Sequence, residues 1–271
     1  MEKLKEKNLP IGVIDSGVGG LTVLKWLQEK MPHENFIYLG DTARCPYGNA
    51  HSEDEILAFA AQMVNTLAQK GVKAIVVACN TMSMLGKDNL RFGLELPIIT
   101  MSFGEKILLE TSQTKHIGLL ATPFTIGKGL HSKAIMAADP QARVIMVPCP
   151  DFVPLIEEEK FDSLELRMAV ARYCKKFKNI DIDTIMLACT HYPFIRREIE
   201  AEMGNKVQIV DPAEQTAQDV IDTLGKDLLL TTGEGKTRIC STADVSRTRR
   251  LAERVLNLKN CEFSEVKLVE L

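Results

Sequence analysis

Two cysteines stand in nearly the same sequence context and are the residues best suited to do chemistry in this chain. Cys79 follows the apolar stretch KAIVVA, Cys189 follows DTIMLA, and a threonine comes within two residues of each cysteine. The two cysteines are 110 positions apart. A thiolate can remove a proton from carbon while a thiol on the opposite face returns one, which inverts a stereocentre without a cofactor. The repeated context therefore predicts Cys79 and Cys189 as paired acid and base.

The other cysteines are expected to be structural. The chain has seven cysteines without regular spacing or a CxxC pair, which favours neither a disulfide framework nor a zinc site. A free cysteine usually packs as a small hydrophobe. We expect this role for four of them: Cys149, Cys174, Cys240 and Cys261. Cys45 is interpreted as a loop residue. Cys79 and Cys189 differ because polar residues follow them directly, and a helix that begins there would favour the reactive thiolate.

Polar residues also follow the first apolar strand. Asp15 ends the stretch IGVID and opens the glycine-rich segment DSGVGG. A carboxylate at a strand end can orient a nearby thiol or relay its proton, and the glycines let the backbone approach a ligand. The segment is not a dinucleotide fingerprint, because Thr22 stands at the third glycine position, and it lacks the GK[ST] of a phosphate-binding loop. A plain turn from strand to helix is the alternative interpretation.

Three further features offer polar groups near these strands. The segment DTARCPYG begins at Asp41, and its Tyr47 and Gly48 can contact a ligand through their backbone or simply form an ordered surface loop. His191 lies two residues after Cys189, where it can serve as a proton partner, because its pKa lies near neutrality, or cap a helix. Glu157 begins an acidic run, and its spacing alone favours a solvated charge.

Short apolar runs alternate with amphipathic helical stretches and must position these residues. The runs predicted as buried strands are Pro10–Ile14, Phe36–Leu39, Ala74–Ala78, Ile117–Leu120, Val144–Val147, Thr184–Ala188 and Val207–Val210. Ser52 and Glu55 fit a capping box at the start of one helix. This alternation predicts an α/β fold with parallel sheets covered on both faces. Both cysteines would then lie at carboxyl ends of strands, where such sheets bind ligands.

Composition excludes several classes of protein. The chain has 271 residues and a formal net charge of −3, so it offers no basic field for nucleic acid or an anionic membrane. The N-terminal sequence MEKLKEKNLP lacks the apolar core of a signal peptide, and no apolar run has the length of a membrane span. We expect a cytoplasmic protein.

Five segments occur in an order that resembles the glutamate racemases, from near the N-terminus to about Asp211. They are IDSGVGG, YLGDTARCPYG, VVACNT, CPDFVPLIEE and LACTHYPF. The resemblance implies two pseudo-symmetric parallel-sheet α/β domains facing across a central cleft. Residues 1–100 plus 213–271 would form the domain with Cys79, and residues 101–212 the domain with Cys189. It also implies conversion of L-glutamate to D-glutamate for peptidoglycan biosynthesis, without a cofactor or a metal, and a homodimer as a candidate assembly.

The resemblance also assigns roles to individual residues. Cys79 and Cys189 become the catalytic thiols, with Asp15 supporting Cys79 and His191 supporting Cys189. Glu157 becomes a second acid near Cys189, and the assignment extends to Asp41. The residues implied to bind substrate are Asp15, Ser16, Tyr47, Gly48, Asn80, Thr81, Thr122, Thr190 and His191. The chain departs from the usual family residues at Met82, Met101–Gly104, Ala188 and within Ala121–His131.

Other functions stay open at this point. A racemase for aspartate or another amino acid would use the same scaffold, although His191 favours glutamate by resemblance. A related decarboxylase keeps one cysteine, and this chain has both. A non-catalytic binding or regulatory homologue would not need both thiols. A pyridoxal-phosphate racemase would need a lysine site, and no such site is identifiable in the sequence.

Overall fold

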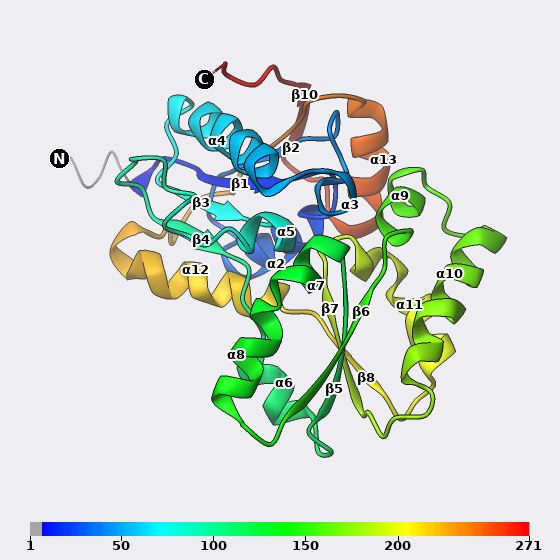
Figure 1. Cartoon of the computed structure of the whole chain (residues 1–271). Helices are drawn as coiled ribbons and strands as arrows, with labels where there is room; N and C mark the ends of the chain where they lie inside the picture. Colours follow the sequence, from blue (N-terminus) through cyan, green and yellow to red (C-terminus); the bar gives the residue numbers. More distant parts are fainter. Residues whose placement is uncertain (1–6, 271) are drawn as a thin grey trace. The chain divides into compact units, whose positions relative to one another are not determined.

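The computed structural model describes residues 7–270 (Figure 1). The charged stretch at residues 1–6, on which part of the signal-peptide argument depends, lies outside the described residues. The described chain divides into two compact units: one contains the residues up to Met101 and from Ala213 onward, and the other is Ser102–Pro212. Among the described residues, no helix is long and apolar enough to cross a membrane.

The first unit is built on a six-stranded parallel sheet with the order β10-β9-β2-β1-β3-β4. Its strands are β1 (Ile11–Asp15), β2 (Phe36–Gly40), β3 (Ala74–Val77), β4 (Ile98–Thr100), β9 (Thr237–Ser241) and β10 (Cys261–Glu265). Every residue of β1, β2 and β3 is buried. Burial on both faces explains why these strands are continuous apolar runs rather than alternating patterns.

The helices of this unit connect and cover the sheet. They are α2 (Leu21–Lys30), α3 (Tyr47–Ala50), α4 (Glu53–Gln69), α5 (Asn80–Ser83), α12 (Ala213–Leu228) and α13 (Val245–Val255). α4 begins with the predicted capping box: the Ser52 side chain accepts from the Glu55 amide, and the Glu55 side chain accepts from the Ser52 amide. α4 contacts β1 and β2, whereas α12 packs on α2 and β4. The C-terminal segment thus completes both the sheet and its helical cover.

The second unit has a four-stranded parallel sheet with the order β6-β5-β7-β8. Its strands are β5 (His116–Ala121), β6 (Arg143–Pro148), β7 (Thr184–Ala188) and β8 (Gln208–Val210). The helices are α6 (Glu105–Thr111), α7 (Pro123–Lys128), α8 (Leu130–Ala138), α9 (Phe152–Glu157), α10 (Leu164–Cys174) and α11 (Arg196–Met203), with the 3-10 turns η1 (Lys175–Phe177) and η2 (Tyr192–Ile195).

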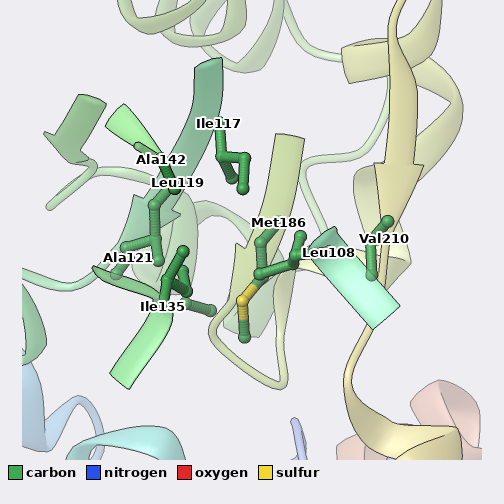
Figure 2. Close-up of a cluster of buried hydrophobic side chains, with 9 residues drawn as sticks. Leu108, Ile117, Leu119, Ala121, Ile135, Ala142, Met186 and Val210 are labelled. Carbon is green, nitrogen blue, oxygen red and sulfur yellow. The ribbon is translucent and has the colours of Figure 1, made fainter. Parts of the chain in front are cut away.

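Part of the core of this unit lies between its sheet and the helices α6 and α8. Figure 2 shows Leu119 and Met186 of the sheet beside Ile135 of α8 and Leu108 of α6. The full cluster of buried residues is Leu108, Ile117, Leu119, Ala121, Ile135, Ala142, Met186, Ala188 and Val210. This packing anchors β7, the strand that leads to Cys189.

The two units share one topology. The order β2-β1-β3-β4 of the first unit has the same pattern as β6-β5-β7-β8 of the second. In each, the chain moves from the first strand to one side and then returns to the other side, which creates a switch point beside the first strand. Cys79 follows the third strand of its unit and Cys189 the third strand of the other. The sequence echo around the cysteines is therefore part of a repeated strand arrangement.

A buried ion pair joins the N-terminal half of the first unit to its C-terminal segment. Lys73 Nζ lies 2.7 Å from Glu34 Oε2 and donates to the Leu228 carbonyl at 2.8 Å, while Glu34 Oε1 accepts from the Leu230 amide. The side chains of Lys73 and Glu34 are fully buried. Losing one partner of such a pair leaves an uncompensated buried charge.

We expect Lys73→Met to lower the free energy of unfolding by about 3–5 kcal/mol, since it strands the Glu34 carboxylate. The matched control is Lys25→Met, which removes a half-exposed lysine 4.0 Å from Glu29 in the same unit and should cost less than about 1 kcal/mol. Urea unfolding followed by circular dichroism measures both variants. Equal losses for the two would contradict the structural role of the buried pair.

Candidate active site

The candidate site residues of the first unit lie at the carboxyl ends of β1 and β3. These strands pair in parallel up to Ile14 and Val77, and the Ala78 amide then donates to the Ile14 carbonyl at 2.8 Å. The next residues in register are Ser16 and Cys79. The Cys79 thiol donates to the Ser16 hydroxyl, with 3.5 Å between Sγ and Oγ. The strand pairing thus places the predicted thiol against the predicted turn.

Asp15 is fully buried beneath this turn. Its Oδ1 accepts from the Gly17 amide at 2.8 Å. Gly20 allows the close packing here, because a Cβ at that position would lie 2.7 Å from the Asp15 Cβ and 3.1 Å from the Ala78 Cβ. Close packing alone therefore explains why a glycine stands at position 20 of DSGVGG, without any contact to a ligand.

The protonation state of Cys79 differs from our expectation. Burial, and next the negative charge of Asp15, raise the pKa of Cys79 to about 12, while hydrogen bonds from Met82 and Ser16 lower it less. The helix that was expected to favour the thiolate is α5, which has only four residues. The raised pKa contradicts the prediction of a stabilised thiolate for Cys79, because it favours the protonated thiol.

Asn80 is the clearest candidate for a ligand-binding side chain in this unit. It is 2 % exposed, and among residues 7–270 neither the oxygen nor the nitrogen of its side-chain amide has a hydrogen-bond partner. Buried polar groups normally have such partners. A ligand that carries both a donor and an acceptor would satisfy this amide. Thr81, the next residue, is also buried.

The loop from Asp41 to Gly48 is held from within. The buried Asp41 carboxylate accepts from Arg44 Nε at 2.6 Å, from Thr242 Oγ1 at 2.8 Å and from the Tyr47 hydroxyl. Burial, and next Asp41, raise the pKa of Tyr47 far above its usual value, so its hydroxyl stays protonated. The Tyr47 side chain thus belongs to the scaffold of the loop.

The candidate site residues of the second unit lie at the carboxyl ends of β5 and β7. Ala121 and Ala188 are paired in register, so Thr122 and Cys189 are the next residues of their strands. Cys189 is 6 % exposed, and Thr190 is likewise buried. Thr122 caps α7: its Oγ1 accepts from the Thr125 amide at 3.4 Å and donates to the Thr125 hydroxyl at 3.0 Å. Thr122 therefore corresponds in register to Ser16 of the first unit.

His191 and Glu157 form a buried pair in this unit. His191 Nε2 lies 2.8 Å from Glu157 Oε1, and both side chains are buried. His191 precedes η2, but its side chain makes no capping hydrogen bond within the described chain. The interpretation of Glu157 as a solvated charge is wrong, because the last turn of α9 turns it inward, while Glu158 beside it is exposed.

The remaining cysteines are placed mostly as expected. Cys149, Cys174 and Cys240 are buried, whereas Cys261 is only partly buried, which corrects the expectation for it. Burial, and next Cys174, raise the pKa of Cys149 well above its usual value, which disfavours its reactive thiolate form. Cys45 lies in the loop before α3 and is partly buried.

The sequence analysis did not single out two residues that support the candidate site, Tyr38 and Thr242. The Tyr38 hydroxyl donates to the Gly17 carbonyl at 2.7 Å and so fixes the turn after Asp15. Thr242 binds Asp41 from a position 201 residues away. Tyr38 lies in an apolar strand, where a tyrosine is as ordinary as any other large residue, and no local pattern links Thr242 to the loop.

Each of the two α/β units therefore has a buried cysteine just after its third strand, Cys79 after β3 and Cys189 after β7. The chain belongs to the Asp/Glu/Hydantoin racemase family, whose model matches residues 19–220. It is 39% identical over 264 residues to glutamate racemase 2 of Caldanaerobacter subterraneus subsp. tengcongensis, covering 97% of each chain. The chain is therefore an amino-acid racemase, which is an isomerase.

Solved structures agree with this assignment. A glutamate racemase isoform from Bacillus anthracis has a TM-score of 0.88 and 34% identity, covering 96% of this chain and 98% of the other. A glutamate racemase from Francisella tularensis in complex with D-glutamate has a TM-score of 0.85 and 33% identity, with the same coverage. The resemblance to glutamate racemases that the motifs indicated is thus confirmed.

Proposed function

We propose that this protein interconverts L-glutamate and D-glutamate with Cys79 and Cys189 as the two acid–base groups. The observation that carries the proposal is the repeated strand end with a buried cysteine. Asp15 acts on Cys79 in one unit, and in the other His191, two residues after Cys189, lies 2.8 Å from the buried Glu157. A relative crystallised with D-glutamate supports glutamate as the substrate. D-Glutamate production for peptidoglycan, a cytoplasmic location and homodimer formation are parts of the same proposal.

The chemistry requires one thiol on each face of the substrate Cα. With L-glutamate, the Cys189 thiolate takes the α-proton, and the electron pair of the broken C–H bond moves toward the α-carboxylate. The Cys79 thiol then donates its proton to the other face, which leaves D-glutamate, a Cys189 thiol and a Cys79 thiolate. The raised pKa of Cys79 favours its protonated form and so suits it to this donor role.

The reverse direction needs a deprotonated Cys79. Its buried neighbour Asp15 is the carboxylate positioned to accept that proton, because its charge acts directly on the thiol. On the other side, His191 can exchange a proton with Cys189, and Glu157 at 2.8 Å stabilises the resulting imidazolium. Each thiol thus has its own proton partner of suitable chemistry.

Glutamate has two carboxylates and one ammonium, and polar groups at the strand ends suit them. The Asn80 amide, which lacks partners among residues 7–270, can donate to a carboxylate and accept from the ammonium. Backbone and hydroxyl groups complete the proposed binding set: Ser16, Tyr47, Gly48, Thr81, Thr122 and Thr190. Such fixed neutral donors can stabilise charge as it grows on the α-carboxylate in the transition state.

The function is tested by incubating the purified protein separately with each enantiomer of glutamate and of aspartate. The decay of the circular dichroism signal of the amino acid measures its racemisation. We expect both glutamate enantiomers to racemise and aspartate to react at least about tenfold more slowly, because its shorter side chain misplaces one carboxylate. Faster reaction of aspartate would identify an aspartate racemase, and no reaction of any substrate would contradict the enzymatic proposal.

The buried pair in the second unit gives a separate prediction. Glu157→Gln should lower kcat about 10- to 100-fold, because an amide cannot stabilise a protonated His191 as a carboxylate does. The matched control is Glu158→Gln, which changes the exposed neighbour and should retain wild-type kcat. Steady-state rates from either enantiomer measure both variants. Equal rates for the two variants would remove Glu157 from the mechanism.

A further inference from the structure

Two segments about 200 residues apart meet beside the loop that carries Tyr47 and Gly48. β2 pairs with β9 so that Gly40 is opposite Ser241. The Thr242 amide continues the pairing by donating to the Gly40 carbonyl at 3.0 Å. Asp41 and Thr242 therefore leave adjacent strands side by side. The turn between β9 and α13 thus lies directly against the start of the loop.

The contact between these segments is reciprocal. Thr242 Oγ1 donates to Asp41 Oδ1 at 2.8 Å and accepts from the Ala43 amide at 3.0 Å. Thr42 Oγ1 donates to the Ala243 carbonyl at 2.6 Å and accepts from the Ala243 amide at 3.0 Å. Each threonine hydroxyl acts both as donor and as acceptor, which valine cannot reproduce. We call these four residues, Thr42, Ala43, Thr242 and Ala243, the threonine clamp.

The Asp41 carboxylate connects the threonine clamp to Arg44 and Tyr47 of the loop. While Oδ1 accepts from Thr242, Oδ2 accepts from Arg44 and from the Tyr47 hydroxyl. The carboxylate is fully buried and accepts three hydrogen bonds, so it positions its neighbours rather than acting on a substrate. Tyr47 in turn lies near enough to Cys79 for the two groups to interact electrostatically.

We propose that Thr242 is a positioning residue for substrate binding, which acts through Asp41 to hold the loop from Asp41 to Gly48 in its binding geometry. This inference rests on the proposed function, because that proposal assigns the Tyr47–Gly48 backbone to the substrate. It gives the C-terminal segment a part in the active site that goes beyond completing the sheet.

The test compares Thr242→Val, Thr242→Ser and the control Thr237→Val. Thr237 is the first residue of β9, the strand that ends just before Thr242, and its hydroxyl accepts from Gln28 Nε2 at 2.8 Å. Its replacement therefore also removes one bonded hydroxyl, at the other end of that strand. We expect Thr242→Val to raise KM for glutamate about tenfold, as expected for the loss of a hydrogen bond to a charged group, with kcat changed less than about twofold. Thr242→Ser should restore wild-type KM, and Thr237→Val should leave KM unchanged.

Amide hydrogen exchange provides a readout that does not need activity. Thr242→Val should speed exchange at residues 41–50 and leave β1 and β3 protected, whereas Thr237→Val should not affect residues 41–50. An unchanged KM together with unchanged exchange in the loop would overturn the inference, even if the melting temperature falls. If Thr242→Val does not fold, Thr42→Val breaks the other half of the clamp and is judged by the same criteria.

Failure of the proposed function and failure of the role of Thr242 give different experimental results. A wild-type protein that fails to racemise glutamate contradicts the proposed function, while faster exchange in the loop of Thr242→Val still supports the structural half of the inference. A racemising wild type with an unaffected Thr242→Val variant contradicts only the inference.

Discussion

Replacing Cys79 by serine is expected to reduce racemisation of glutamate by at least about 10³-fold, since proton transfer in each direction needs this group. A serine hydroxyl is far less acidic than a thiol, so it neither donates nor accepts the α-proton at a useful rate. The two enantiomers have equal free energies, so kcat/KM must fall by the same factor in both directions. Cys189→Ser should behave in the same way, and circular dichroism measures both.

A half-reaction separates the two thiols. A glutamate analogue with a leaving group at Cβ eliminates that group once Cα is deprotonated, which needs only one base. Cys79→Ser should still act on the L-analogue through Cys189, and Cys189→Ser on the D-analogue through Cys79. The control is Cys240→Ser, which changes a buried cysteine within β9 and should racemise normally. Wild-type racemisation by Cys79→Ser would contradict the two-thiol mechanism.

Replacing Asp15 by asparagine is expected to lower kcat about 100-fold and, at the same time, to lower the pKa of Cys79. The second effect follows because the negative charge of Asp15 is, after burial, the largest cause that raises this pKa. The thiolate of Cys79 would therefore form at lower pH in the variant. Activity would nevertheless fall, since the asparagine side chain cannot take the thiol proton.

The pKa is measured by the ultraviolet absorbance of the thiolate as a function of pH. The titration of Asp15→Asn is compared with that of the double variant that also carries Cys79→Ser, which isolates the signal of Cys79. A variant whose rate rises as the pKa of Cys79 falls would show that Asp15 only opposes ionisation. That result would remove Asp15 as a proton acceptor.

The sequence predicted the buried strands well because their burial dictates their composition. Each apolar run interpreted as a strand forms one in the structure, with ends that differ by at most one residue. The strands β4, β9 and β10 were not predicted. β4 has three residues, and β10 is the edge strand CEFSE with partly exposed or exposed residues throughout. Short or edge strands lack the continuous apolar signal on which the prediction depends.

The positions of the candidate site residues were predictable where these residues end a strand or closely follow one. Asp15, Cys79 and Cys189 stand at such positions, and strand pairing alone brings Ser16 level with Cys79. Thr242 was not predictable, because its contact with Asp41 depends on the pairing of β2 with the unpredicted β9. The charge state of Cys79 was misjudged because burial and a neighbouring carboxylate outweigh the effect of a four-residue helix.

The most direct test of two thiols acting from opposite faces is racemisation of L-glutamate in D2O. Proton NMR at low conversion measures deuterium at Cα in the product and in the remaining substrate. We predict D-glutamate that is deuterated in nearly every molecule, because its proton comes from a solvent-exchanged Cys79, and L-glutamate that retains its original hydrogen. D-Glutamate that carries the original hydrogen, or equal deuteration of both enantiomers from the start, would indicate a single base and contradict the mechanism.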